Sequence, residues 1–278
     1  MACAYPSYNP NVRSALTGEM LPIPCCNCFN CRLDFQYQAI DRMYCAWKSH
    51  NVSAFVTFTY DDNHLIINDG FKNATLSKDD VHKYLDKIKH QLNIPFEYYL
   101  CGEYGDKFNR PHYHAVFFGL DYQLHKSFFE NSWKKGSVKV LPCNAKAFRY
   151  VSKYITSSQG SNDSEYFDYG IIPPFRKMSR GLGLTQFKLH FNELCEYGYF
   201  FLDGRKIKPN RYYFNKLITM NKDFIVLYER LIQQKNLATS KEAYKLNLSQ
   251  KLYNLRKTAN LESQLASKAL RTSSKLKM

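Results

Sequence analysis

The sequence predicts an α+β protein built on an antiparallel sheet, with helices on one face and a basic, mainly helical region after it. From residue 53 onward, segments with strand and helix periodicity follow in the order β-α-β-β-α-β. A short polar turn joins the two middle strands, as in an antiparallel hairpin. This order is the ferredoxin-like, or RRM-like, pattern, in which the second sheet face stays open for chemistry.

The first elements follow from residue spacing. Apolar residues recur at helical intervals from Leu33 to Trp47, which predicts an amphipathic helix over residues 31–48. Apolar and polar residues alternate over 53–60, which predicts a strand. Ser77 is placed to cap a further helix, whose buried side runs from Val81 to Leu92.

The remaining elements complete the pattern. Residues 96–103 and 112–119 predict two strands, joined by a polar turn at 105–111. The predicted elements that follow are a helix near 122–133, a strand at 137–141 and a helix at 144–157.

Length and composition bound the class of protein. A chain of 278 residues with 45% apolar residues can bury a full core. No apolar run has the length of a membrane span, and the first residues lack the pattern of a signal peptide, so we expect a cytoplasmic protein. The predicted organisation is a Cys-rich segment with a helix at 1–50, a core at 51–204 and a basic helical region at 205–278.

Positive charge is concentrated in the last quarter of the chain. Residues 205–278 hold 17 Lys and Arg against 4 Asp and Glu, whereas residues 1–204 hold 22 against 20. Such a segment neutralises phosphates and releases counterions, so nucleic acid is the first candidate partner. The alternative is a solvated basic segment with no specific partner.

His112 and His114 form the strongest candidate metal site. On a strand they point to the same face and can hold one cation, although an isolated H-x-H pair is more often structural or exposed. Mg²⁺ or Mn²⁺ needs an oxygen ligand as well, and Glu103 lies at the end of the neighbouring predicted strand. Asp106 and Asp61 are the alternative carboxylates.

Tyr150 and Tyr154 are candidate nucleophiles. Four residues apart on a helix, they share a face that flanks its apolar stripe. The chain has 22 tyrosines, most of which must be packing residues, so spacing alone is weak support. Lys153, and also Lys146 or Arg149, can contact phosphate or reduce the cost of forming a phenolate.

The early cysteines suggest a zinc site that is incomplete in sequence. Cys25, Cys28 and Cys31 repeat at C-x-x-C spacing, but no second C-x-x-C supplies a fourth ligand. The nine cysteines and the absence of a secretory signal favour reduced thiols or metal ligands over disulfides. Candidates for the fourth ligand are Cys26, Cys45, His50 or a cysteine elsewhere, and the alternative is a set of packed thiols.

A set of polar and basic residues is expected to line a DNA surface. Two threonines lie on the strand predicted beside the histidines, and three cations alternate with apolar residues in a Gly- and Pro-bearing segment. Phe175 and Met178 in that segment can equally pack against the core. The predicted DNA-binding residues are Thr57, Thr59, Arg176, Lys177 and Arg180.

Three motifs together resemble those of HUH-type rolling-circle replication initiators. They are the strand at 55–62, the H-x-H strand and the Y-x-x-x-Y helix. The stretch 101–106 leading into RPHYH, the cluster CCNCFNC and residues 174–181 resemble more narrowly the initiators of gokushovirus-like single-stranded DNA phages (Microviridae). The resemblance runs from about Cys25 to Gly183.

The resemblance implies an activity. One tyrosine attacks the scissile phosphate, giving a 5′-phosphotyrosine and a free 3′-OH, and a second tyrosine allows strands to be rejoined. It also implies single-stranded origin DNA, a host helicase and a host DNA polymerase as partners. Two alternatives stay open: an HUH relaxase or transposase, and a non-catalytic single-stranded DNA-binding protein.

Overall fold

A computed structural model describes residues 3–14, 17–106, 108–153, 163–231 and 233. Within the described residues, 3–34 and 186–233 form one compact unit, and 35–185 form another. The predicted boundaries at residues 50 and 204 stay predictions.

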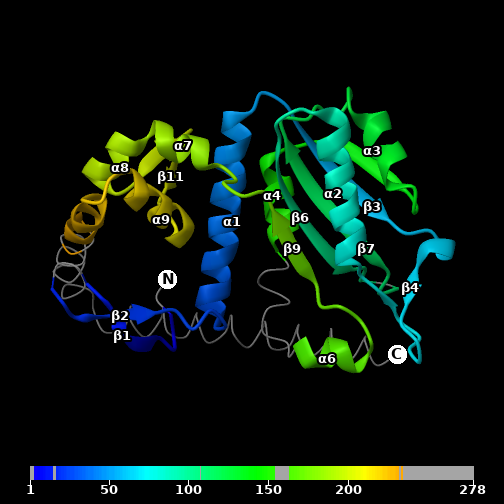
Figure 1. The fold of residues 1–278 in the computed structure, drawn as a ribbon, viewed down its shortest axis with the longest axis horizontal. Coiled ribbons are helices and arrows are strands. Elements are labelled where there is room, and N and C mark those ends of the chain that lie inside the picture. The colour runs from blue at the N-terminus through cyan, green and yellow to red at the C-terminus, as the bar shows by residue number, and fades with distance from the viewer. Residues whose placement is uncertain (1–2, 15–16, 107, 154–162, 232, 234–278) are drawn as a thin grey trace, which may run out of the picture. The chain divides into compact units, whose positions relative to one another are not determined.

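The larger unit is built on a five-stranded antiparallel sheet (Figure 1). Its spatial order is β8 (Val138–Pro142), β3 (Ser53–Thr59), β7 (Pro111–Phe118), β6 (Glu97–Tyr104) and β9 (Phe175–Met178). The predicted α+β class and its antiparallel sheet are confirmed. The histidine strand β7 is central, which holds its side chains between two hydrogen-bonded neighbours.

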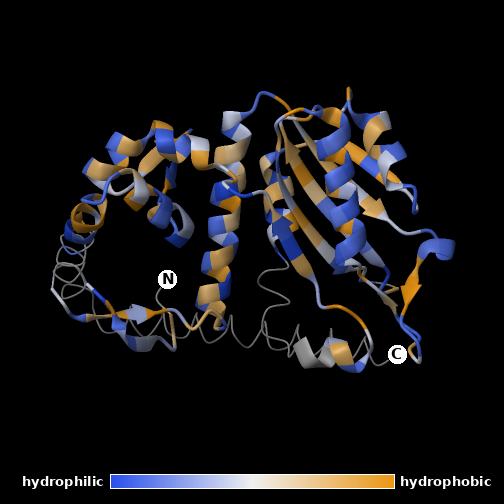
Figure 2. Ribbon diagram, viewed as in Figure 1, coloured by the Kyte–Doolittle hydropathy of each residue, from blue (hydrophilic) through white to orange (hydrophobic). Residues whose placement is uncertain are grey.

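The first face of the sheet is covered by α2 (Lys78–Leu92) and α3 (Lys126–Trp133). The Ser77 side chain accepts a hydrogen bond from the Asp80 N–H, so the predicted cap is confirmed. Figure 2 shows hydrophilic residues along the outer side of α2 and hydrophobic residues in the strands behind it. The fully buried core on this face includes Val56, Phe58, Leu85, Ile88, Tyr113, Phe117 and Phe129.

The second face also carries helices, which corrects the expectation that helices cover one face only. Both α1 (Phe29–Ser49) and α4 (Ala145–Ser152) pack there. Their contact with the sheet centres on Val116 and Phe118, at one end of β7. The strands are buried on both sides at this end, and the chemistry is confined to the opposite end of β7.

The strand β9 was not predicted, because residues 175–178 read as a polar loop. Their backbone pairs with β6 from Tyr99↔Met178 to Gly102↔Phe175. An unpaired sheet edge accepts any extended segment that satisfies its backbone groups, so a weak strand pattern suffices there. The other predicted elements are confirmed within a few residues at their ends, as far as the described residues reach.

The other unit contains two separate hairpins. One joins β1 (Ser7–Arg13) to β2 (Met20–Ile23), and the other joins β10 (Phe200–Leu202) to β11 (Arg205–Ile207). Phe187, Tyr213, Leu217 and Phe224 are buried in this unit. Its helices are α7 (Leu184–Leu189, which begins in the larger unit), α8 (Phe191–Tyr197), α9 (Arg211–Met220) and residues 224–231.

The small elements of the larger unit are η1 (Asp62–His64), β4 (Ile66–Ile67), β5 (Ala74–Thr75) and α6 (Asp163–Asp168). Among the described residues, none of the helices combines the length and apolarity needed to cross a bilayer.

Candidate active site

The register of three neighbouring strands brings the predicted metal ligands together. Glu103 on β6 lies directly opposite His112 on β7, and Thr57 on β3 lies opposite His114. Directly paired residues share a sheet face, and residues two apart on a strand share it as well. The two histidines, Glu103 and Thr57 therefore project from the same side of the sheet.

The three predicted ligands converge on one carboxylate oxygen. Oε1 of Glu103 lies 2.9 Å from Nε2 of His112 and 3.0 Å from Nε2 of His114. Glu103 is 1% exposed and His114 is 5% exposed, whereas the His112 side chain keeps 17% exposure. Two imidazole nitrogens and a carboxylate oxygen thus meet in a buried cluster that opens to solvent beside His112.

The outer nitrogens of both histidines are held by the protein. Nδ1 of His114 lies 2.8 Å from the Thr57 hydroxyl, and Nδ1 of His112 lies 3.1 Å from the Arg110 carbonyl. Such partners fix imidazole orientation in metal sites. Thr57, predicted to contact DNA, is placed to position His114, and Thr59 bonds to the Ser137 hydroxyl at 2.8 Å.

Burial and mutual hydrogen bonding set the charges of the cluster. Burial raises the pKa of Glu103, but its hydrogen bonds with both histidines outweigh burial and bring the pKa below the ordinary value. Burial lowers the pKa of His112, but its hydrogen bond with Glu103 outweighs burial and raises the pKa. For His114, burial dominates and lowers the pKa. Glu103 is therefore an anion facing one imidazole that protonates easily and one that stays neutral.

One carboxylate oxygen of Glu103 is left without a partner. Oε2 is buried and makes no hydrogen bond to any described residue. A buried charged acceptor without a donor is costly, and such atoms in functional sites commonly face an ion. The orphaned oxygen makes the cluster suitable for a cation.

Tyr150 reaches this cluster from α4. Its hydroxyl lies 3.2 Å from Nε2 of His114, the nitrogen that also faces Glu103. The ring of Phe55 stacks on His114 and meets Tyr150 edge-on, which fixes the two rings relative to each other. Burial and the negative charge of Glu103 raise the pKa of Tyr150 to about 12.

The other predicted catalytic residues have different outcomes. Nζ of Lys153 lies 4.5 Å from the centre of the Tyr150 ring. Lys146 and Arg149 are exposed on α4, and Tyr154 lies outside the described residues.

The alternative carboxylates do not join the cluster. Asp61 accepts hydrogen bonds from the backbone and side chain of His64. Asp106 lines a small pocket together with Phe108, Arg110 and His112, but its carboxylate is not among the grouped ligands. Glu103 is the carboxylate that the strand register brings to both histidines.

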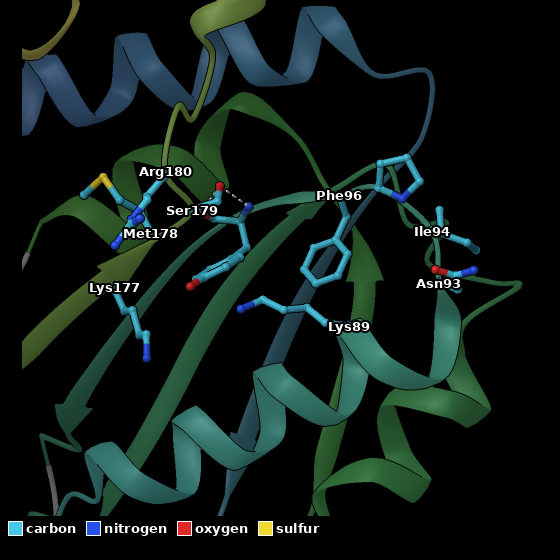
Figure 3. Close-up of a pocket in the computed structure, with 10 residues that line it drawn as sticks. Lys89, Asn93, Ile94, Phe96, Lys177, Met178, Ser179 and Arg180 are labelled. Carbon is cyan, nitrogen blue, oxygen red and sulfur yellow. Dashed lines mark hydrogen bonds between the residues drawn. The ribbon is translucent and has the colours of Figure 1, made fainter.

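The predicted DNA-binding cations separate onto two faces. Arg176 pairs with Cys101 and so shares the face of the metal cluster, where it lies 5.8 Å from the Phe35 ring. Lys177 pairs with Leu100 on the α2 face, 3.3 Å from Nδ1 of His82. Figure 3 shows Lys177 and Lys89 extending over one pocket, which Arg180 also lines.

The cysteine cluster gains a member that sequence spacing did not single out. Cys25, Cys28 and Cys31 lie together with Cys3, and their four sulfur atoms are all within 4.8 Å of one another. The named alternatives lie elsewhere: Cys26 bonds to the Pro24 carbonyl, Cys45 is buried in α1, and His50 faces Glu97. The signal in the sequence is the strand pair between Cys3 and Cys25, which returns the chain to its start.

Comparison with known proteins places this site in a family context. Residues 53–159 match the family model of replication-associated proteins of the ORF2 type, a span that contains the three clustered ligands and Tyr150. The chain resembles phage replication-associated proteins. The resemblance to the replication proteins of small phages is thus confirmed.

Three curated relatives support this. The chain is 26% identical over 213 residues to replication-associated protein VP4 of Bdellovibrio phage phiMH2K, covering 68% of this chain and 65% of the relative. It is 31% identical over 186 residues to replication-associated protein ORF2 of Spiroplasma virus 4, covering 59% and 57%. For replication-associated protein ORF4 of Chlamydia phage 1 the identity is 21% over 252 residues, covering 78% and 59%.

The chain therefore spans less than two thirds of the length of each of these relatives. No solved structure matches it.

Proposed function

We propose that this protein initiates phage DNA replication in the host cytoplasm as a metal-dependent, site-specific nicking and closing enzyme. The observation that carries the proposal is the Tyr150 hydroxyl, 3.2 Å from Nε2 of His114 beside the Glu103 carboxylate. A phenol next to a cluster suited to a cation is the arrangement that phosphoryl transfer to tyrosine requires. The names of the curated relatives agree with a role in replication.

Glu103, His112 and His114 would hold Mg²⁺ or Mn²⁺. The fit rests on the converging nitrogens, the buried anion and the orphaned Oε2 of Glu103. Two imidazole ligands favour Mn²⁺, because Mg²⁺ prefers oxygen ligands more strongly. When bound, the cation polarises the scissile phosphate and stabilises charge in the transition state.

Tyr150 would act as nucleophile. Its oxygen forms a bond to phosphorus, the bond from phosphorus to the 3′ oxygen breaks, and that oxygen leaves as a 3′-OH. The phenol proton must be lost as the bond forms, which is costly because the pKa of Tyr150 is raised to about 12. The cation of Lys153, over the same ring, reduces this cost.

Tyr154 would supply the second step. Its hydroxyl attacks a second origin phosphate, and the free 3′-OH then attacks the first phosphotyrosine, so that the number of phosphodiester bonds is conserved. The proposal rests on the four-residue spacing from Tyr150 and on the family resemblance.

Single-stranded origin DNA would lie across the face that bears the metal cluster. Arg176 shares this face, and the pocket beside His112 is lined by the exposed ring of Phe108 and by Arg110. Bases stack on aromatic rings and phosphates pair with such cations. The basic region from residue 205 would add nonspecific affinity, and host helicase and DNA polymerase would act on the nicked product.

A covalent-adduct assay tests this function. Full-length protein, single-stranded phage origin DNA and Mn²⁺ should give a protein–DNA adduct that survives denaturation. His112→Ala or His114→Ala should abolish the adduct while DNA binding is retained. The control is His90→Ala, an exposed histidine on α2. Absence of any wild-type adduct would favour the non-catalytic DNA-binding alternative.

A further inference from the structure

Four sulfur atoms from three separate segments converge in the smaller unit. Cys3 precedes β1, Cys25 and Cys28 lie between β2 and α1, and Cys31 is in the first turn of α1. The Sγ atoms of Cys3 and Cys28 are 3.9 Å apart, and those of Cys25 and Cys31 are 4.0 Å apart. All nine cysteines are free, and these distances are about twice the length of a disulfide bond.

The spacing of the sulfurs matches a tetrahedral metal site. A zinc–sulfur bond of about 2.3 Å implies an edge of about 3.8 Å between sulfurs in a regular tetrahedron. The two measured distances are close to this edge. Packed thiols in an apolar core have no reason to form a four-membered group with this spacing.

Backbone N–H groups point at the sulfurs of the cluster. The Cys25 N–H donates to Sγ of Cys3 at 3.2 Å, and the Cys28 N–H donates to Sγ of Cys25 at 3.3 Å. Donors aimed at sulfur stabilise the thiolate form, which is the form that ligates a metal. The chain takes a left-handed turn at Cys26, which turns its own sulfur away to the Pro24 carbonyl.

The hairpin next to the cluster lacks stabilisation of its own. Every residue of β1 is exposed, as are the first three residues of β2. A two-stranded hairpin without a buried face is at best marginally stable in water. Cys3 and Cys25 flank its open end, where Ser7 pairs with Ile23, so a shared ligand would hold the two strands together.

We propose that Cys3, Cys25, Cys28 and Cys31 form a structural zinc site that closes the base of the β1–β2 hairpin and ties it to the start of α1. Binding displaces the thiol protons to solvent, and the closed set of four thiolates is typical of structural zinc. Tetrahedral sulfur sites accept zinc or iron, and only zinc requires no redox partner. The site is separate in its ligands from the cluster at Glu103.

Metal content tests the site directly. The double variant His112→Ala/His114→Ala is used throughout, so that the other cluster cannot hold the metal. This full-length protein should purify with one equivalent of zinc by elemental analysis. Replacement by Co²⁺ should give thiolate charge-transfer bands and the intense d–d bands of tetrahedral cobalt. Iron in place of zinc, or no bound metal together with nine reactive thiols, would overturn the proposal.

The role of Cys3 has its own test. Cys3→Ser should lose the bound zinc or bind it at least roughly tenfold more weakly, whereas Cys26→Ser should retain it, because Cys26 points away. Unchanged zinc content and cobalt spectrum in Cys3→Ser would show that a different residue completes the site.

Proteolysis gives a readout that does not depend on enzymatic activity. Arg13 is the trypsin site within the hairpin, at the end of β1. Removing zinc with a chelator should accelerate cleavage after Arg13 severalfold, and added zinc should reverse this. Equal cleavage rates with and without zinc would refute the structural role.

Discussion

The hydroxyl of Tyr150 and Nε2 of His114 lie 3.2 Å apart, although 36 residues separate them in the chain. The contact depends on where α4 begins. Asn144 caps this helix by accepting hydrogen bonds from the N–H groups of Lys146 and Ala147, and Phe148 and Val151 bury its inner side. Tyr150 is thereby carried to the end of β7 where the histidines lie.

The tyrosines should separate nicking from rejoining. Phenylalanine keeps the ring but removes the attacking oxygen, so the double variant Tyr150→Phe/Tyr154→Phe should form no covalent DNA adduct. At least one single variant should still cleave yet fail to complete strand transfer. Peptide mass spectrometry should find the phosphotyrosine at one of these positions, and Tyr37→Phe, an exposed residue of α1, is the control. Undiminished adduct in the double variant would refute the two-tyrosine mechanism.

Thr57 should affect metal affinity without contacting the metal. Thr57→Val keeps the shape of the side chain but removes the hydroxyl 2.8 Å from Nδ1 of His114. Loss of such an outer partner typically weakens metal affinity or activity roughly 10–100-fold. Mn²⁺ titration should show this for Thr57→Val, whereas Thr59→Val, on the same strand, should bind as wild type. Equal affinities in all three proteins would show that His114 needs no orienting partner.

Mn²⁺ binding should release protons and strengthen with pH. The His112 pKa is raised above its ordinary value in the metal-free protein, chiefly by the hydrogen bond with Glu103, which outweighs burial. Its imidazole must lose a proton to become a ligand, so affinity should rise as pH increases through this raised pKa and then level off. Calorimetry in two buffers of different ionisation enthalpy measures the proton count. A pH-independent affinity between pH 5 and 8 would contradict the assignment of His112 as ligand.

The same shift predicts how stability depends on pH. Because the folded pKa of His112 is above its unfolded value, its contribution to stability is complete below the unfolded value and is lost as pH rises through the folded one. Glu103 has a lowered pKa, so its contribution is lost as pH falls through its folded value. In urea unfolding of the metal-free protein, His112→Ala should flatten the loss of stability on the alkaline side of neutrality. An unchanged pH profile would argue against the ion pair.

Two neighbouring cations on β9 should differ in their effect on DNA binding. Arg176 shares the sheet face of the metal cluster, whereas Lys177 points to the α2 face. Arg176→Gln should weaken binding of single-stranded origin DNA severalfold and reduce the salt slope by about one contact, and Lys177→Gln should have little effect. The opposite result in a filter-binding assay would place the DNA over the pocket of Figure 3 instead.

The end of the chain should supply salt-sensitive affinity. Residues 234–278 hold 10 Lys and Arg against 2 Asp and Glu. A stop after residue 233 should flatten the dependence of DNA affinity on salt, because fewer counterions are released, and should spare cleavage of a short oligonucleotide. An earlier stop at residue 203 would also remove the buried Tyr213, Leu217 and Phe224. An unchanged salt slope after the later stop would assign the segment another role.

The sequence by itself determined the local elements and the chemical types of the site. Period-two alternation placed β3, β6 and β7, and Ser77 with the helical spacing after it placed α2. The H-x-H spacing put both histidines on one face, because successive side chains on a strand alternate. These features depend on neighbouring residues alone, so they are readable from the chain.

Tertiary structure alone decided which distant residues complete the sites. The choice of Glu103 over Asp61 and Asp106 depends on the pairing of β6 with β7, and the role of Thr57 depends on the register of β3. The second layer of helices, the edge strand β9 and the approach of Cys3 to Cys25 depend likewise on long-range packing. Spacing along the chain fixes the direction of a side chain, but only the pairing of strands and the packing of helices fix what it meets.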